Sequence, residues 1–273
     1  MTLDFKKSAT SLAVVLLSAP ALTAEPTSKV VAVDDIEWGY LNPLRGELSP
    51  GAADLWGDRT QDTATGMLVR FKKGFESPPH IHNITYRGVV IDGLMHNDDP
   101  TAEKMWMPTG SFWTQPAGED HTTAANGEVN LIYLEIDAGP YLVKPSKEKF
   151  DNGERPLNLH KDNIVWLNDS DLHNLEADGV QSTYLWGNTA AVNGSMVKLP
   201  SGFEGSISTE ASEFRAVVIS GEISYDSKDL ETAVKLGAGS YIESEGKFTH
   251  EITNSGNEAV TIYIRADDKY NVK

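Results

Sequence analysis

The amino-acid sequence predicts an all-β fold made of two tandem antiparallel β-barrels. Short apolar or alternating segments, such as residues 67–71, 129–136 and 261–264, have the patterns of strands, and glycine and proline recur between them. No long stretch of the sequence has helical periodicity. Many short strands joined by turns are typical of a sandwich or a barrel, and an internal repeat indicates that the unit occurs twice.

The internal repeat relates positions that lie 128 residues apart. The tripeptide GFE at residues 74–76 recurs at residues 202–204, and the segment YRGVVIDG at residues 86–93 recurs as FRAVVISG at residues 214–221. Self-similarity at a fixed offset indicates a duplicated structural unit. A single large barrel would not repeat in this way.

The repeat also predicts the domain organisation. We expect an N-terminal barrel over residues 25–150 and a C-terminal barrel over residues 151–273, with Ile36 and Ile164 opening equivalent strands. The proline-containing segment at residues 139–162 is the predicted crossover between them. Open strand edges need cover, so we also expect pairing between the barrels or between chains, and a homo-oligomer is one outcome.

The chain begins with the pattern of a secretory signal peptide. Lys6 and Lys7 precede the apolar run at residues 12–17, and small residues follow up to Ala24. The apolar run is too short to span a bilayer comfortably. We therefore expect a signal peptide over residues 1–24, and a mature protein that is periplasmic or secreted.

The composition excludes several kinds of chemistry and partner. The 273 residues contain no cysteine, so neither a disulfide nor a thiolate nucleophile or ligand is available. With 40 acidic and 23 basic residues the net charge is −17, which disfavours nucleic acid and anionic membrane surfaces as partners. A small-molecule ligand is the partner class that we expect.

A histidine pair is the first sign of a metal site. His80 and His82 are separated by one residue, and in an extended strand such residues point to the same side. Pro78 and Pro79 lack the N–H groups of a central strand, so the pair is expected where a strand begins.

A third histidine follows a predicted hairpin. A short strand after Gly110 leads to a turn at Pro116-Ala-Gly118, and His121 begins the next strand. Three neutral imidazoles with open positions between them suit a divalent metal ion, and Fe, Zn, Ni, Cu and Mn all remain candidates. The sequence thus predicts a metal site formed by His80, His82 and His121.

These segments resemble the two sequence motifs of the cupin family. The matching positions are Gly74, His80, His82 and Gly93 in the first motif, and Gly110, Pro116, Gly118 and His121 in the second. The segment HNITYRGVVI resembles the sequences of the bicupin family DUF4437, which is related to the cupin module of ChrR-type anti-sigma factors. The resemblance implies jelly-roll barrels over nearly all of the mature chain.

The chain departs from the cupin pattern at one ligand. Tyr86 and Arg87 occupy the two positions where the family has a glutamate, and Asn126 lies one place beyond the asparagine of the second motif. Tyr86 is the candidate catalytic residue, because its hydroxyl could donate a hydrogen bond to a bound substrate; the alternative is a packed tyrosine. Arg87 points to the other face and recurs as Arg215, which favours a structural or interface role. Asn126 or a backbone carbonyl is expected to orient the histidine rings.

His96, His160 and His173 are not expected to bind metal. His96 follows the first motif in a predicted turn, where a solvated loop histidine is expected. His160 and His173 have no partner at ligand spacing and are expected at the surface.

The second barrel is expected to have lost the metal site. At the same offset Ser208 and Glu210 stand where His80 and His82 do, and only His250 matches a histidine. Two functions remain open. The chain is either a metal-dependent dioxygenase, with Fe(II) acting on a small chelating substrate, or a non-catalytic, sensor-like cupin that binds a small ligand or a structural Zn(II).

Overall fold

The computed structural model describes residues 26–170, 172–187 and 191–273, so the predicted signal peptide at residues 1–24 lies outside the described residues. The described chain is all-β, as predicted, and the only helices in these ranges are 3₁₀ helices. They are η1 (Val33–Asp35), η2 (Pro43–Leu48), η3 (Ser146–Glu148) and η4 (Lys161–Asn163). None of the described helices has the length and apolar character to cross a bilayer.

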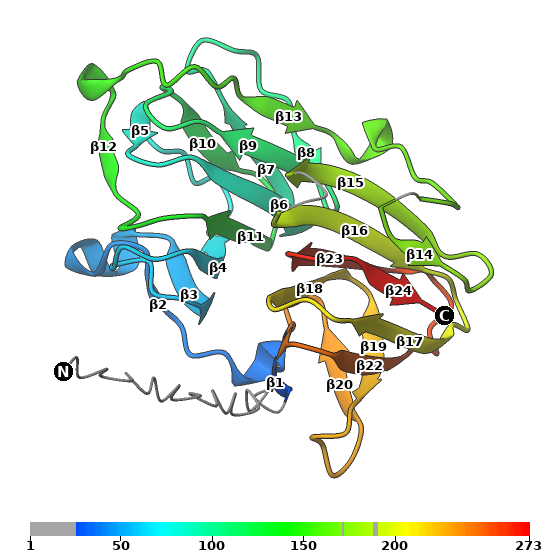
Figure 1. The fold of residues 1–273 in the computed structure, drawn as a ribbon. Helices are drawn as coiled ribbons and strands as arrows, with labels where there is room; N and C mark the ends of the chain where they lie inside the picture. The colour runs from blue at the N-terminus through cyan, green and yellow to red at the C-terminus, as the bar shows by residue number, and fades with distance from the viewer. Residues whose placement is uncertain (1–25, 171, 188–190) are drawn as a thin grey trace, which may run out of the picture.

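The N-terminal half contains one large sheet and two small ones (Figure 1). In spatial order, the large sheet consists of β13 (Leu157–Leu159), β9 (Phe112–Gln115), β6 (Tyr86–Asp92), β11 (Asn130–Ile136), β4 (Thr65–Phe71), β3 (Gly51–Trp56) and β2 (Gly39–Tyr40). The small sheets are β10 (Thr122–Ala125), β7 (Leu94–Asp98) and β8 (Met107–Pro108), and the pair β12 (Val143–Pro145) and β5 (His80–His82).

The C-terminal half contains two six-stranded sheets. The first, in spatial order, consists of β1 (Thr27–Val31), β21 (Tyr241–Glu245), β18 (Phe214–Ser220), β23 (Val260–Ala266), β16 (Asn193–Leu199) and β15 (Gln181–Gly187). The second consists of β14 (Asn174–Leu175), β24 (Tyr270–Val272), β17 (Glu204–Thr209), β22 (Phe248–Thr253), β19 (Glu222–Asp226) and β20 (Val234–Gly237). The pairing of β14 with β24 is parallel, and the other pairings are antiparallel.

The two halves exchange edge strands. β1, at the start of the described chain, pairs with β21 of the C-terminal half, and its repeat equivalent β13 pairs with β9 of the N-terminal half. The edges of β21 and β9 are thus each covered by a strand from the other half of the chain. Ile36 and Ile164 are equivalent, but the expectation that they open strands is wrong, because each directly follows a 3₁₀ helix. The domain boundary near residue 150 stays a prediction. β13 follows this boundary in the sequence, although it pairs with a strand of the N-terminal half.

Three apolar cores follow from the alternation of side chains along the strands. On β11, Ile132, Leu134 and Ile136 point into the N-terminal barrel. Tyr133 points the other way and packs in a second core together with Tyr263 of the C-terminal half. A third core fills the C-terminal barrel. Both faces of the large sheets are therefore buried, and the two barrels pack against each other through them.

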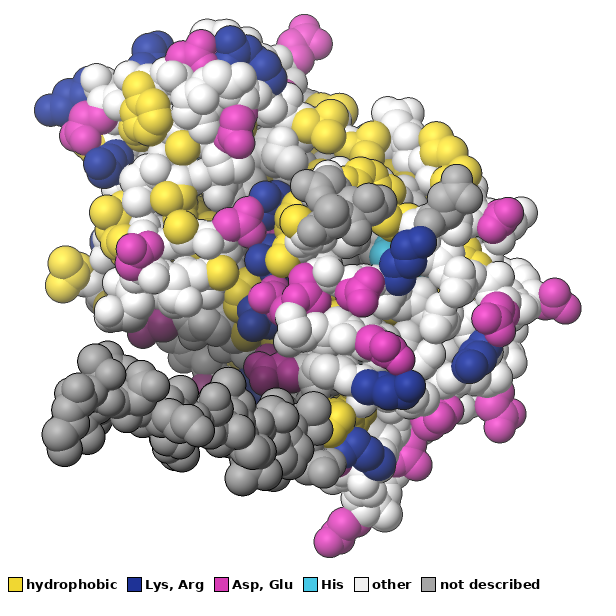
Figure 2. Space-filling model, in the orientation of Figure 1, with side chains coloured by type: hydrophobic (Ala, Val, Ile, Leu, Met, Phe, Trp, Pro, Cys, Tyr) yellow, Lys and Arg dark blue, Asp and Glu magenta, His cyan; other side chains and the backbone are white. Residues whose placement is uncertain are grey.

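Equivalent tryptophan–tyrosine pairs, one within each half, line the contact between the barrels. The indole of Trp56 donates a hydrogen bond to Tyr133, 3.1 Å away, and Trp186 donates one to Tyr263, 2.8 Å away. The Arg87 guanidinium lies 3.7 Å from the ring centre of Trp186, in the other barrel. This contact confirms the interface role expected for Arg87. Figure 2 shows acidic side chains scattered over the C-terminal half of the visible face, with Lys and Arg among them.

Candidate metal centre

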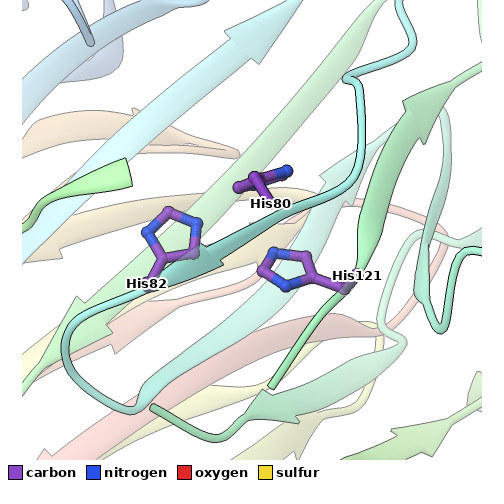
Figure 3. Close-up of side chains that lie close together, drawn as sticks. All are labelled: His80, His82 and His121. Atoms are coloured by element: carbon purple, nitrogen blue, oxygen red, sulfur yellow. The ribbon is translucent and has the colours of Figure 1, made fainter. Parts of the chain in front are cut away.

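Two neighbouring strands bring the three predicted histidines together. His80 and His82 lie on β5, and His121 directly precedes β10. His80 and His121 face each other in an antiparallel bridge, in which each N–H donates to the carbonyl of the other over 3.0 Å. The turn before His121 needs Gly118, whose φ of +79° favours glycine. Figure 3 shows the three imidazoles turned toward a common space.

The geometry of the cluster suits a single ion. The candidate ligand atoms of His80, His82 and His121 all lie within 4.8 Å of one another. The three residues are 9%, 2% and 0% exposed, respectively. Within the described ranges this is the one cluster of three or more histidine or carboxylate side chains with such spacing, and it contains no carboxylate.

Backbone carbonyls orient two of the rings. Nδ1 of His80 lies 3.0 Å from the carbonyl oxygen of Pro78, and Nδ1 of His121 lies 3.0 Å from that of Glu119. A carbonyl can only accept, so Nδ1 carries the hydrogen and Nε2 keeps its lone pair for a metal. Of the two partners expected to orient the histidine rings, the backbone carbonyl is the one that does so. Asn126, the other candidate, is exposed and does not orient a ring.

The electrostatics keep the cluster neutral. Burial lowers the pKa of His80 and, together with the neighbouring imidazoles, lowers the pKa of His82 well below its ordinary value. Burial and the neighbouring His80 lower the pKa of His121 to about 3. Neutral imidazole is the form that binds metal. The residues present therefore fit a divalent metal ion, which would retain its full charge at this site.

Tyr86 lies beside the cluster and belongs to a buried polar network. Its hydroxyl donates to Oδ1 of Asn97 over 3.0 Å and lies 3.4 Å from Nε2 of His121. Asn97 in turn donates to Gln115 over 2.8 Å. The hydrogen-bond acceptor for this hydroxyl is thus a side chain and not the backbone. No motif in the sequence indicates a role for Asn97, because the network joins strands that are distant along the chain.

Tyr141 is a site residue that the sequence motifs do not reveal. Its hydroxyl lies 3.2 Å from Nε2 of His82, and its ring stacks on that imidazole at 4.4 Å. Burial, and then the nearby Tyr86, raise the pKa of Tyr141 well above its ordinary value. The residue lies in the segment for which the sequence predicts only a crossover between the barrels.

The second barrel has no equivalent cluster within its described residues. His250 is buried, and its ring nitrogens contact the hydroxyls of Tyr225 at 2.9 Å and Ser244 at 3.1 Å. The residue opposite His250 is Ile207, so the predicted match of Ser208 to His80 is one position off. Glu210 is exposed and pairs with a lysine.

Two further histidines differ from expectation. His96 does not lie in a solvated turn but on β7, where it is 2% exposed. His173 is not at the surface, because it is 1% exposed and its ring stacks on Tyr270 at 3.7 Å. Neither belongs to the three-histidine cluster.

Comparisons with known proteins agree with this fold. A family model for a domain of unknown function, DUF4437, matches residues 29–273. The chain is similar to the structure of a proposed dioxygenase from Nostoc punctiforme, with a TM-score of 0.61 and 15% identity, over 90% of this chain and 80% of that one. A sequence search among curated proteins found no match.

Two further structures have a similar fold. Oxalate decarboxylase from Lactobacillus farciminis, in a formate complex, gives a TM-score of 0.56 at 12% identity, over 88% of this chain and 86% of that one. AerE from Microcystis aeruginosa gives 0.54 at 14% identity, over 85% and 96% of the two chains. At these identities the similarity shows the fold alone. Together with the three-histidine cluster it supports a metal-binding protein.

Proposed function

The chain belongs to the DUF4437 family within the cupin superfamily, and from this premise we propose that it is an Fe(II)-dependent dioxygenase acting on a small chelating substrate. His80, His82 and His121 are the proposed metal ligands. The observation that carries the proposal is the convergence of these three neutral imidazoles inside one barrel, with two of the rings oriented by carbonyl groups.

The proposed chemistry follows from the charge of the site. A divalent iron with open positions supplies Lewis acidity and reactivity toward O2. Because no carboxylate lies in the cluster, the site favours an anionic substrate that offers two oxygen atoms. Tyr86, at 3.4 Å from His121, is the proposed hydrogen-bond donor to that substrate, and it would give up its hydrogen bond to Asn97 when the substrate binds.

The burial of the site supports a second candidate function. All three histidines are at most 9% exposed, so little of their surface is open to solvent. A non-catalytic cupin that holds a structural Zn(II) needs less access than an enzyme does. The dioxygenase remains the first proposal, because a metal held by three histidines keeps open coordination positions at which a substrate can bind and react.

We also propose that the protein is exported, to the periplasm or the medium, on the strength of the pattern at residues 1–24. Self-association through exposed strand edges is the proposed assembly. Both proposals are separate from the metal chemistry.

Metal analysis followed by oxygen consumption tests the proposed function. Protein purified without added metal should contain close to one iron per chain, and should consume O2 with a member of a panel of β-diketones and enolisable acids. Tightly bound zinc without oxygen uptake would favour the non-catalytic function. Protein that retains no metal after loading and dialysis would refute both.

A further inference from the structure

We propose that the phenol oxygen of Tyr141 is a fourth protein ligand of the metal held by the three histidines. This inference rests on the proposed function, since it requires a metal at the cluster. It goes beyond that function because it adds an oxygen ligand to a cluster of three histidines that contains no carboxylate.

The position of the Tyr141 hydroxyl carries the inference. It lies 3.2 Å from Nε2 of His82. Two ligands that each bind one ion at about 2.1 Å and at a right angle are about 3.0 Å apart. The observed spacing is therefore close to that of two neighbouring ligand atoms.

The hydroxyl also loses its partner when metal binds. The hydrogen bond to His82 is the one that the described structure gives the Tyr141 hydroxyl. If Nε2 of His82 binds a metal, its lone pair can no longer accept this hydrogen bond. A hydroxyl enclosed by protein is costly to leave unpaired, and the ion would be the nearest available partner.

The backbone around Tyr141 holds the ring in place. Asn83 donates to the carbonyl of Pro140 over 2.9 Å and accepts from the N–H of Leu142 over 2.8 Å, so it brackets Tyr141 on both sides. The N–H of Tyr141 donates to the carbonyl of Arg59 over 2.8 Å. Ligands need such support to keep their geometry.

Tyr86 offers a matched comparison. Both tyrosines place a hydroxyl beside a histidine of the cluster, but that of Tyr86 already donates to Asn97 over 3.0 Å. Tyr86 thus keeps its partner when metal binds, whereas Tyr141 does not. Of the two, Tyr141 is the one whose oxygen can turn to the ion.

The coordination step is balanced without a redox change. The O–H bond of Tyr141 breaks, its proton passes to water, and the oxygen forms the bond to the metal as phenolate. Ferric ion is the probe, because a phenolate bound to Fe(III) gives a visible charge-transfer absorption that histidine ligands do not give. The readout is therefore independent of catalytic activity.

The experiment compares the wild-type protein with Tyr141→Phe and Tyr86→Phe after loading with ferric ion and dialysis. Iron content and circular dichroism are measured on the same samples. We expect the visible band in the wild type and in Tyr86→Phe, and its loss in Tyr141→Phe together with at least about tenfold weaker iron retention.

Two results would overturn the inference while leaving the metal site intact. One is wild-type protein that holds iron without the visible band, a result that needs no variant to fold. The other is a Tyr141→Phe protein that keeps the band. Wild-type protein that holds no iron would instead refute the metal site itself, and the iron content distinguishes this case from the other two.

Discussion

At the scale of single residues, the three histidines are held in different ways. His80 and His121 are each fixed by a carbonyl two positions earlier in the chain, so their orientation follows from the local backbone. His82 instead contacts Tyr141, which lies on the crossover segment. The cluster thus joins two locally fixed rings to a third whose environment depends on a distant segment.

Replacing His82 by Ala should abolish metal retention and leave the β-fold in place. Two remaining imidazoles, even with the proposed oxygen ligand of Tyr141, make a weak site, and the second barrel already folds around a different set of residues at the equivalent position. Elemental analysis after dialysis measures the effect. His160→Ala is the control, because His160 lies outside the cluster and caps η4 by accepting a hydrogen bond from the N–H of Asp162. Equal metal content in the wild type and His82→Ala would exclude His82 as a ligand.

His250 should contribute to acid denaturation of the metal-free protein. Burial lowers its pKa in the folded state to about 3, whereas the unfolded value is near 6.5. As the pH falls below about 6.5 the unfolded state binds the proton first, so this contribution to stability is complete above that pH and is lost toward pH 3.

His250→Gln tests this contribution because it removes the titration and keeps a polar side chain. Urea unfolding between pH 7 and pH 4 should show a fall in the free energy of unfolding that is shallower than in the wild type, by up to about 1.4 kcal/mol per pH unit. Parallel curves for the two proteins would mean that His250 takes up its proton equally in both states.

The candidate site could be predicted in part from the sequence. The three histidines lie in short motifs whose spacing fixes their direction, so the sequence alone is enough to group His80, His82 and His121. The sequence alone does not indicate that Tyr141 and Asn97 belong to the site. Each reaches the site through pairing between strands that are distant in the sequence, and no local pattern encodes such pairing.

At the scale of elements, strand exchange links the barrels. β1 covers the edge of β21, and its Val30 and Val31 pack against two different cores. Cleavage near Ala24 would leave β1 complete. The N-terminal strand is therefore part of the C-terminal barrel, although it precedes the N-terminal one in the chain.

Removing residues 1–32 should destabilise the protein by about 3 kcal/mol or more, because two valines that pack against the cores are lost. It should also promote association, because β21 would present an open edge. Thermal unfolding and light scattering measure the two effects. A chain that starts at Glu25 is the matched control. If both truncated chains behave alike, the pairing of β1 with β21 contributes little.

Repeat alignment predicts the elements better than it predicts their register. Strands recur at the offset of the repeat, yet Ile207, and not Ser208, lies opposite His250. The prolines at positions 78 and 79 shorten the first-half strand to β5, whereas β17 runs without interruption from Glu204 to Thr209. A slip of one residue exchanges the inward and outward side chains, and equal spacing in the sequence does not reveal it.

At the scale of the whole molecule, a buried carboxylate lies at the contact between the barrels. Glu135 is 1% exposed, and its oxygens accept hydrogen bonds from Tyr133 at 3.0 Å and from Tyr263 of the other barrel at 2.8 Å. Arg87 and Arg265, one from each barrel, lie 3.6 Å from it. The carboxylate thus connects tyrosines and arginines of both halves.

This arrangement breaks the symmetry of the repeat. The tyrosines at positions 133 and 263 are equivalent, but the position equivalent to Glu135 is held by Arg265. The Arg265 side chain is 5% exposed and also contacts Asp137 at 2.9 Å and Glu213 at 2.6 Å. A duplicated interface has therefore acquired opposite charges at matching positions, which favours one relative placement of the barrels.

Glu135→Gln should lower the free energy of unfolding by about 2–4 kcal/mol, because the two tyrosine hydroxyls lose a charged acceptor and the buried arginines lose part of their counter-charge. Urea unfolding measures the loss. Glu128→Gln is the control, since Glu128 is exposed and pairs only with Lys73 at the surface; its effect should stay within about 0.5 kcal/mol. Because the carboxylate contacts both halves, the loss should also separate their unfolding into two transitions. A single unshifted transition in Glu135→Gln would show that apolar packing alone holds the two barrels together.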